Sequence, residues 1–335
     1  MGLNTQYIEP ATLTGYVRRG IEDAQAGSLA RFLPNSSVMN TSVRFTVGDN
    51  GLVDEAEVRD FDAEPAPAGG YKSQRKTVDL VAISRRIPVA ESEKLLARVG
   101  GDTAVRNLIL STTNVVVRAI ADRVEKLRGE LIETGKVVIN QGDFGLDNDF
   151  GRDADLSFTL SQLVTDGTSD VLSALVDASN LIAEKTGQAP GTALTSRKVI
   201  AAFLRHGQFA PKVASGATRP ATLADVNAVL ADTGLPTLEA YDKRTKAGRV
   251  LSEDKLFLLP AAGDVNGESE LGGSIWGITE SSFKPEFGLA DSTIPGAVAA
   301  VWDKEGTAGS TIVDADSTFM PILKNANLSA AIKVI

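Results

Sequence analysis

Short strings of residues that resemble catalytic motifs occur along the chain, and each lacks the context that its chemistry needs. Gly129, Gly135 and Lys136 resemble a phosphate-binding loop, but five residues separate the two glycines instead of four. Val137 stands where a Ser or Thr hydroxyl would bind magnesium, and a predicted helix precedes the string where a strand is required. We therefore expect no nucleotide-phosphate site at this position.

Three further strings are fragments of larger signatures: Asp143-Phe144-Gly145, Ser252-x-x-Lys255 and Lys185-Thr186-Gly187. The first is the metal-binding triplet of protein kinases, but neither a glycine-rich lid nor a His-Arg-Asp loop accompanies it. The other two are acyl-transferase motifs, which occur here in the reverse of the required order. None of the three predicts catalysis.

His206 is the only histidine, and the chain has no cysteine. A histidine-dependent triad would have to use His206, which follows a predicted helix, and there we expect a favourable interaction with the helix dipole instead. Without cysteine, disulfide bonds and thiolate metal sites are excluded. A hydrolase that uses two carboxylates stays open, because the 43 acidic residues form many pairs. We expect no cofactor.

An acidic tongue follows the longest predicted helix. It contains Asp143, Asp147, Asp149, Arg152, Asp153 and Asp155. A calcium loop needs ligands at alternate positions, a central glycine and a glutamate at its twelfth position, and the spacing here does not match. We expect no metal site, and predict a turn-rich tongue between two strands.

The composition describes an acidic globular protein. With 34 Lys and Arg against 43 Asp and Glu the net charge is −9, and 43% of the residues are hydrophobic. A sequence-independent grip on nucleic acid needs a dense basic face, so the charge argues against one. The sequence has no apolar run of eighteen residues and no signal-peptide pattern, so we expect synthesis in the cytoplasm and no membrane partner.

The longest predicted element is a helix from Asp102 to Thr134. Asp102 is a suitable N-cap and Gly135 a suitable stop. At about 1.5 Å per residue the helix spans on the order of 50 Å, which indicates a strut across an elongated subunit. Its predicted buried face consists of Val105, Ile109, Thr112, Val116, Ile120, Val124, Leu127 and Leu131.

Residues 1–40 contain one short helical pattern, which Gly15, Gly20 and Gly27 interrupt. We do not expect so interrupted a segment to make a core of its own. We predict an arm that gains order by lying on another body, with a frayed terminus as the alternative.

Two runs with a period of two, from Val43 and from Val78 to Val89, predict a long hairpin. Its outgoing limb is acidic and its return limb is basic. Pairing across the strands of one hairpin would balance these charges. Alternatively, the loop of one subunit meets its neighbour head-to-tail. The candidate contacts between subunits are then Asp54, Glu55, Glu57, Asp60, Lys72, Arg75, Lys76, Arg85 and Arg86, together with Asp143, Asp147, Asp149, Arg152 and Asp153 of the tongue.

From Ser169 onward, shorter helices and strands alternate, which predicts a mixed α+β domain. Ser196 and Thr222 are suitable helix N-caps. The predicted strands are Thr192–Thr195, Thr237–Tyr241, Leu256–Leu259, Ile275–Thr279, Ala297–Val301, Thr311–Val313 and Ile332–Ile335.

Four sequence segments are spread over most of the chain. Each one alone is weakly diagnostic of a protein family, but their order and spacing together are more specific. They are YIEPATLTGYVRR, KTVDLVAISRRIPV, TGKVVIN followed by DFGRDADLSF, and LPTLEAYDKRTKAGRVLSEDKLFLLP. With the order of the predicted parts, they resemble tailed-phage major capsid proteins of the Hong Kong 97-like fold, and most closely the lambda-type major capsid protein E family.

The resemblance implies an α+β phage capsid fold, divided into an N-terminal arm (1–40), an extended β-hairpin E-loop (41–93), a P-domain with the spine helix (94–166), an A-domain (167–320) and a C-terminal strand that returns to the body (321–335). It implies a major capsid protein, not an enzyme, that forms hexamers and pentamers of an icosahedral head around double-stranded DNA without reading its sequence. A cargo compartment of the same fold, an encapsulin, stays open as the alternative.

The resemblance also implies a scaffolding and a portal protein as partners, a decoration protein as a further one, and the virion as the location. Some members of the fold crosslink subunits through a Lys–Asn isopeptide bond, for which Lys72 or Lys76 would supply the amine. No acceptor asparagine matches a motif here, and lambda-type relatives more often use a decoration protein.

Overall fold

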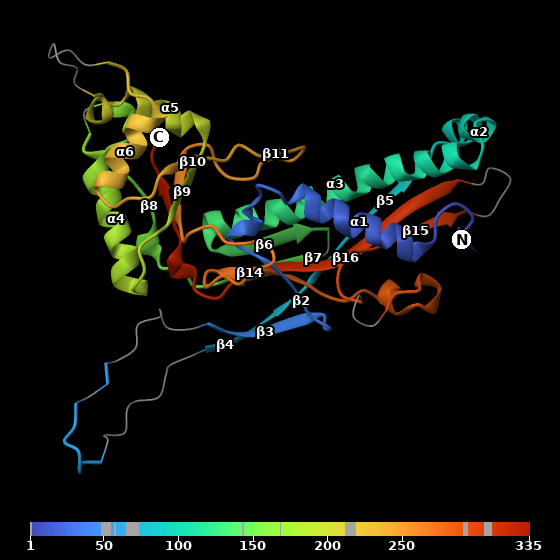
Figure 1. Ribbon diagram of the computed structural model, residues 1–335, viewed down its shortest axis with the longest axis horizontal. Coiled ribbons are helices and arrows are strands. Elements are labelled where there is room, and N and C mark those ends of the chain that lie inside the picture. The colour runs from blue at the N-terminus through green and yellow to red at the C-terminus, as the bar shows by residue number, and fades with distance from the viewer. Residues whose placement is uncertain are drawn as a thin grey trace.

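The computed structural model describes residues 2–47, 55–56, 58–64, 74–142, 144–167, 169–211, 219–290, 294–304 and 310–335. The subunit is elongated, and its longest helix, α3 (Asp102–Thr134), runs along the body to a second domain at one end (Figure 1). Residues 58–64 lie far from both. Among the described helices, none combines the length and the hydropathy needed to cross a membrane.

Helix α3 has the predicted bounds. Gly135 ends it in the left-handed conformation at φ 72°, as the glycine stop predicts. At the other end the predicted N-cap is wrong by one residue: Gly101 is the N-cap, and Asp102 lies in the first turn, where its negative charge interacts favourably with the helix dipole. Thr113, not Thr112, lies on the buried face. The helix packs on the body sheet with this apolar face.

Gly129, inside α3, allows the close approach of another segment. A Cβ at this position would lie 2.5 Å from Val250 Cγ1 and 2.6 Å from the Val250 carbonyl oxygen. Both distances are too short for any side chain, so glycine is required where the chain near Val250 crosses the helix.

A six-stranded sheet forms the body beneath α3. Its order is β1-β15-β16-β14-β2, and β5 pairs with β16 beside this path. The long strand β16 extends well beyond the predicted run Thr311–Val313, because Asp314 and Asp316 alternate with the buried Ala315 and Ser317. The strands are β1 (Gly2–Leu3), β2 (Asn35–Ser37), β5 (Val81–Pro88), β14 (Gly272–Trp276), β15 (Val298–Asp303) and β16 (Thr311–Leu323).

The N-terminal segment folds onto the body of its own subunit, so the prediction of an arm ordered by another body is wrong for residues 2–37. Helix α1 (Pro10–Ala24) buries Leu13, Val17 and Ile21 against α3 and β15. A Cβ at Gly20 would lie 3.1 Å from Val117 Cγ1, so the glycine that weakens the helical pattern lets α1 and α3 pack closely. Strand β1 pairs with β15, and β2 pairs with β14.

The second domain has its own sheet, in the order β10-β9-β13-β17-β8, and its own hydrophobic core. The predicted caps are confirmed: Ser196 caps α5, and Thr222 forms a capping box with Asp225 at α6. The elements are β8 (Ser157–Thr159), α4 (Val171–Thr186), β9 (Thr192–Thr195), α5 (Arg197–Arg205), α6 (Leu223–Asp232), β10 (Leu238–Ala240), β13 (Lys255–Leu259) and β17 (Ala330–Lys333).

The two cores divide the chain differently from the predicted boundaries. Strands β14 to β16 lie within 167–323 of the sequence but belong to the body sheet. The C-terminal strand β17 does the reverse: it pairs with β13 and β8 in the second domain instead of returning to the body. The reason is long-range pairing, because Ile332 and Val334 are buried in the second core.

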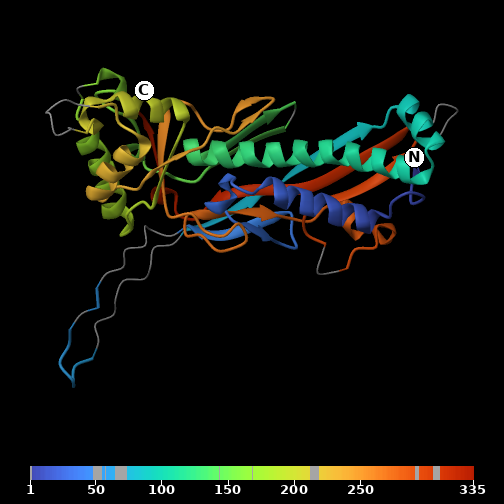
Figure 2. The ribbon, with the colours of Figure 1, turned by 45° about the horizontal axis from the view of Figure 1, so that its top comes forward.

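In the described part of the predicted hairpin, the paired strands lie at its base: β3 (Ser42–Val47) and β4 (Gln74–Asp79), which pair antiparallel. The predicted return strand from Val78 to Val89 is two strands, because after Leu80 the chain leaves the hairpin and β5 pairs along β16. Figure 2 shows the paired base beside the body and residues 58–64 far from it.

The remaining elements lie on the surface of the body. Helix α2 (Glu91–Val99) was not predicted; it lies at the end opposite the second domain (Figure 1) and leaves Leu95, Leu96 and Val99 exposed. The short strands are β6 (Lys136–Gln141), β7 (Phe144–Asp149), β11 (Arg244–Thr245) and β12 (Gly248–Arg249).

A buried polar network joins the N-terminal segment, α3 and the second domain. Arg128 lies 3.5 Å from Glu125, and both side chains are almost completely buried. Arg128 also donates to Asn35 Oδ1 at 2.6 Å and to Ser274 Oγ at 2.8 Å. Glu125 accepts from the Leu29 amide at 2.9 Å and from the Tyr241 hydroxyl. Burial lowers the pKa of Arg128 to about 10, so the guanidinium stays charged at neutral pH.

Candidate inter-subunit surface

The base of the hairpin is fixed to the body by Lys76, one of the predicted contact residues. Its ammonium donates to the Asp149 carbonyl oxygen and lies 4.8 Å from the centre of the Phe150 ring. Phe45 on the opposite strand stacks on the same ring at 6.3 Å. Partial burial lowers the pKa of Lys76, partly offset by the charge of Asp149. Lys76 is therefore a docking residue within the subunit, not a loop-tip amine.

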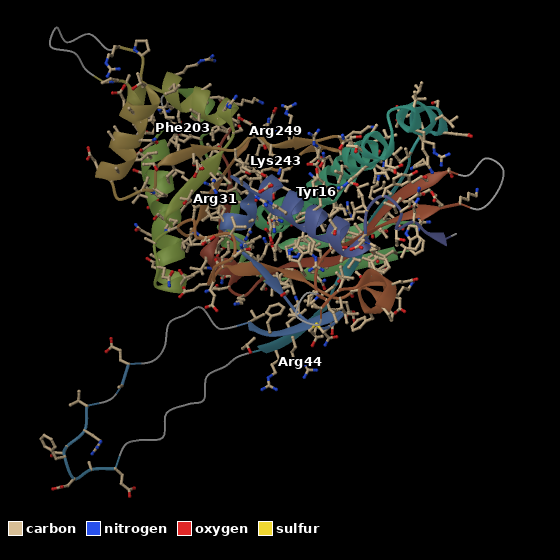
Figure 3. The ribbon with its side chains drawn as sticks, turned by 45° about the vertical axis from the view of Figure 1, so that its right-hand side comes forward. Tyr16, Arg31, Arg44, Phe203, Lys243 and Arg249 are labelled. Atoms are coloured by element: carbon tan, nitrogen blue, oxygen red, sulfur yellow. The ribbon has the colours of Figure 1, made fainter. Side chains whose placement is uncertain are left out.

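The outer segment, defined as residues 58–64, has large apolar side chains that are fully exposed and contact no other element among the described residues. Val58 and Phe61 are 101% and 100% exposed. They lie among Asp60, Asp62 and Glu64, and Figure 3 shows the side chains of this segment standing clear of the body. Solvent-exposed apolar side chains beside acidic residues are typical of a surface that binds another chain.

Charge balance within one hairpin is not observed in the described part. The β3–β4 pairing ends at Val47 and Gln74, before most of the acids of the outgoing limb begin. Glu55 and Asp60 form no ion pair with the return limb among the described residues, and neither does the exposed Arg75. Asp54, Glu57, Lys72 and Asp143, also predicted contacts, lie outside the described residues.

Arg85 and Arg86 lie on β5 in the body sheet, not on the hairpin where the sequence pattern placed them. Arg86 pairs with Asp314 of β16 at 2.6 Å, and this hydrogen-bonded pair raises the pKa of the guanidinium. Arg85 is the next residue of the strand, so it points to the opposite face. There it has no ion-pair or hydrogen-bond partner among the described residues.

A groove of ≈ 510 Å³ opens on that face, between β5, α3 and the β6–β7 hairpin. Arg85 and the half-buried Arg123 line it, and no acidic residue does. Its apolar walls include Ile83, Ile139 and the half-exposed Phe144. The sequence analysis missed Arg123, although it lies on the polar side of the predicted helix. The groove thus has two cations without a counter-charge among the described residues.

Three residues of the acidic tongue, Asp149, Arg152 and Asp153, have partners inside the subunit. Asp149 pairs with Lys136 at 2.6 Å, and Asp153 pairs with Lys185 at 2.6 Å. The Arg152 guanidinium donates to the last carbonyl groups of α3, including that of Ile132 at 2.6 Å. Burial lowers the pKa of Arg152 to about 10. Asp147 lies on β7, opposite Val138 of β6. We therefore assign Arg152 a helix-capping role and leave it out of the proposed contacts.

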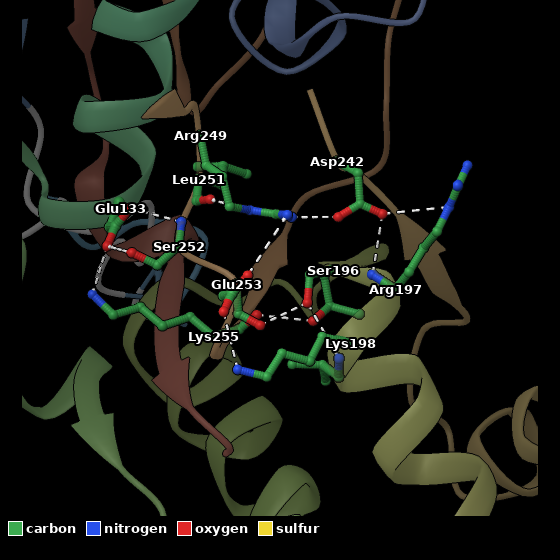
Figure 4. A network of polar contacts seen from close by, with 12 residues as sticks. Glu133, Ser196, Arg197, Lys198, Asp242, Arg249, Leu251, Ser252, Glu253 and Lys255 are labelled. Atoms are coloured by element: carbon green, nitrogen blue, oxygen red, sulfur yellow. Dashed lines mark hydrogen bonds and ion pairs between the residues drawn. The ribbon is translucent and has the colours of Figure 1, made fainter. Parts of the chain in front are cut away.

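The Ser252-x-x-Lys255 string lies at the junction of α3 with the second domain (Figure 4). Ser252 donates through its hydroxyl and its amide to Glu133, and Lys255 lies 2.7 Å from the same carboxylate. Partial burial opposes ionisation of Glu133, but the hydrogen bonds from Lys255 and Ser252 outweigh it and lower the pKa. Lys255 thus holds a carboxylate that fixes α3 to β13, which explains the string without catalysis.

A second set of ion pairs lies beside this junction. Asp242 pairs with Arg249 and with Arg197 of α5, and Glu253 pairs with Lys198 at 3.0 Å. Figure 4 shows these contacts connecting the segment near Val250 to the start of α5. In the described ranges, no group of three or more His, Asp or Glu side chains could hold a metal ion.

His206 is almost completely buried between α5 and the segment before α4. Its Nδ1 accepts from the Gln208 amide at 3.3 Å, so Nε2 carries the proton and donates to Ser169 Oγ at 3.1 Å. Burial lowers the pKa of His206. The predicted favourable interaction with the helix dipole requires a cation, and is therefore wrong at neutral pH.

We expect the single histidine ring to titrate below its ordinary pKa of about 6.5. The pKa of His206 is lower in the folded state than in the unfolded state, so the unfolded state binds a proton more readily as the pH falls. The stability that His206 contributes is therefore present above the unfolded pKa and is lost as the pH falls through the folded pKa. Histidine ring resonances followed by NMR, and denaturation between neutral and mildly acidic pH, check this. His206→Gln should remove that part of the pH dependence; a midpoint above 6.5 would contradict the expectation.

Comparison with known proteins gives a consistent match. Residues 9–329 match the family model described as phage major capsid protein E. A search of curated proteins found no match. Among solved structures, a protein assigned as the capsid protein of a prophage in Escherichia coli CFT073 superposes with a TM-score of 0.62 at 12% identity, covering 96% of this chain and 99% of that one.

Two further structures share the fold. A phage-related protein from Bordetella bronchiseptica RB50 has a TM-score of 0.60 at 15% identity, covering 95% of this chain and 96% of that one. A virus-like particle from Pyrococcus furiosus has a TM-score of 0.50 at 12% identity, covering 96% and 97%. At these identities the likeness shows the fold alone.

Proposed function

The chain belongs to the phage major capsid protein E family, and from this premise we propose how its copies join. The protein is a structural subunit that self-assembles into the shell of a phage head, and so is a component of the virion. What the family does not give is the set of residues that hold two neighbouring copies together.

We infer that the outer segment of one copy binds the groove of the next. The observation that carries this proposal is the full exposure of the Val58 and Phe61 side chains within the described part of the subunit. The groove is complementary, because it combines apolar walls with Arg85 and Arg123, whereas the segment combines Phe61 with Asp60 and Asp62. An interaction of unlike surfaces is head-to-tail, and it forms a ring when the rotation between successive copies closes after a whole number of copies.

The other exposed predicted residues, Glu55, Arg75 and Asp147, are secondary contacts in this proposal.

We propose hexamers and pentamers as the rings, double-stranded DNA as the enclosed cargo, and scaffolding, portal and decoration proteins as partners. Synthesis takes place in the host cytoplasm. The second domain corresponds to the A-domain, and the body to the P-domain. The excess of acids would keep the inner wall from gripping DNA.

We propose that the subunit has no catalytic activity. The Ser252-x-x-Lys255 string has a structural explanation in its contacts with Glu133, and His206 is buried with both ring nitrogens in hydrogen bonds. A carboxylate hydrolase and a cargo compartment are the two other functions. Cleavage of a substrate by the purified chain would support the first, and a co-purified enzyme inside the particles would support the second.

The experiment that tests the assembly proposal is expression of the full chain with and without the other head proteins of its phage. We expect closed particles by negative-stain electron microscopy and a fast boundary in sedimentation velocity. Protein that stays monomeric at high concentration under both conditions would overturn it. Particles that contain DNA instead of an enzyme would distinguish a phage head from a cargo compartment.

A further inference from the structure

A second pocket, separate from the groove, lies where α1 meets the edge of the body sheet. Its volume is ≈ 250 Å³, and Arg18, Gln25, Asn35, Trp276 and Gly296 are among its lining residues. A single water occupies about 30 Å³ in the liquid, so the pocket has room for a small organic group.

The hydrogen bonds of Asn35 fix the orientation of the Gln25 amide. Trp276 Nε1 and Arg128 Nη2 can only donate, and they reach Asn35 Oδ1 at 3.0 Å and 2.6 Å. Asn35 therefore donates through Nδ2 to Gln25 Oε1, at 2.5 Å. This leaves the Gln25 NH₂ group as a donor. Gln25 is only 3% exposed, and its Nε2 has no acceptor among the described residues.

Arg18 supplies a second donor of the same kind. Its Nε donates to the Ala297 carbonyl oxygen at 2.8 Å, but its buried Nη2 has no acceptor in the described part of the chain. Gly296 lies beside the guanidinium, and its φ of +114° is a backbone conformation that favours glycine. Burial lowers the pKa of Arg18, which Glu22 partly offsets.

A buried donor without an acceptor destabilises the folded protein, and two such donors line one pocket. We propose that this pocket binds a single carboxylate group, whose two oxygens accept from Arg18 and Gln25. A singly charged ligand fits better than a phosphate dianion, because Glu22 also lines the pocket. Trp276 provides an aromatic wall for the carbons next to the carboxylate. This proposal does not rest on the contact between segment and groove.

Two sources share this chemistry: an acidic side chain of a second copy, and a free small carboxylate. The probe is blocked aspartate, N-acetyl-aspartate amide, with blocked asparagine as its neutral match. Trp276 is the reporter in a Trp302→Phe background, because the chain has only two tryptophans. We expect a saturable change in fluorescence of full-length, unassembled subunits with blocked aspartate, and at least about fivefold weaker binding of blocked asparagine.

Arg18→Gln and Gln25→Leu should each weaken the response, whereas Arg19→Gln, at the exposed neighbouring position, should not. Emission without the probe reports whether each variant is folded, and Arg18→Gln tests the site if Gln25→Leu does not fold. No saturable response to blocked aspartate, an equal response to blocked asparagine, or an unchanged response in Arg18→Gln would each overturn the proposal.

Repeating the titration on assembled shells separates the two sources. If a neighbouring copy supplies the carboxylate, the shells will no longer bind the probe that free subunits bind. If the ligand is a free carboxylate, shells and subunits will bind it equally. Neither result depends on whether the outer segment occupies the groove.

Discussion

Arg128→Met is expected to lower the free energy of unfolding of the subunit by about 3–5 kcal/mol. The substitution keeps most of the side-chain volume but leaves Glu125 charged and buried without its cation. It also removes the donors to Asn35 and Ser274, which connect the N-terminal segment and β14 to α3. Chemical denaturation of the unassembled full-length subunit, followed by circular dichroism, measures the effect.

Two controls separate the buried charge from a general effect on α3. Arg106→Met, at an exposed position on the same helix, should leave stability unchanged within error. Glu125→Gln combined with Arg128→Met should recover much of the loss, because no charge then remains buried. If the Arg128→Met variant is as stable as the unchanged protein, the network does not join the segments as we argue.

Reversing the charges of the groove is expected to prevent assembly without unfolding the subunit. The double variant Arg85→Glu/Arg123→Glu places two acids opposite Asp60 and Asp62 of the neighbouring copy, and like charges at an interface cost several kcal/mol. Because the same contact recurs at every copy of a shell, we expect the assembled fraction to fall by at least about tenfold. Sedimentation velocity and negative-stain microscopy measure it.

The complementary change provides the decisive control. Asp60→Lys/Asp62→Lys alone should also block assembly, whereas all four substitutions together should restore particles, because the two charge patterns are again opposite. Arg118→Glu, exposed on α3 and absent from the groove lining, should assemble normally. If each double variant blocks assembly but the combination of all four substitutions does not restore particles, the segment binds elsewhere. That result would leave the proposed function as a shell protein unaffected.

Part of the intersubunit surface was accessible from the sequence. The opposite charges of the two limbs predicted Asp60 and Arg85 as contacts between subunits, and both belong to the surface that we propose. The sequence pattern placed Arg85 on the hairpin, however, because the run from Val78 to Val89 was interpreted as a single strand. Pairing with β16, more than 200 residues later, assigns β5 to the body. Arg123 faces the groove only because β5 lies beside α3.

The sequence by itself determined the elements whose signals are local. The bounds of α3, its stop at Gly135 and the caps Ser196 and Thr222 follow from side chains within one helical turn, so they need no tertiary context. The four strings and their order were also sufficient for the family, because they span most of the chain.

Only the tertiary structure decided which segments share a core. The N-terminal segment belongs to the body because Leu13, Val17 and Ile21 meet α3 and β15 there, and β17 belongs to the second domain because its partner is β13. Glu125 and Arg128 are charged residues on an apolar face, and their partners come from three distant segments. Burial and pairing at such separations depend on the whole chain, so no local pattern encodes them.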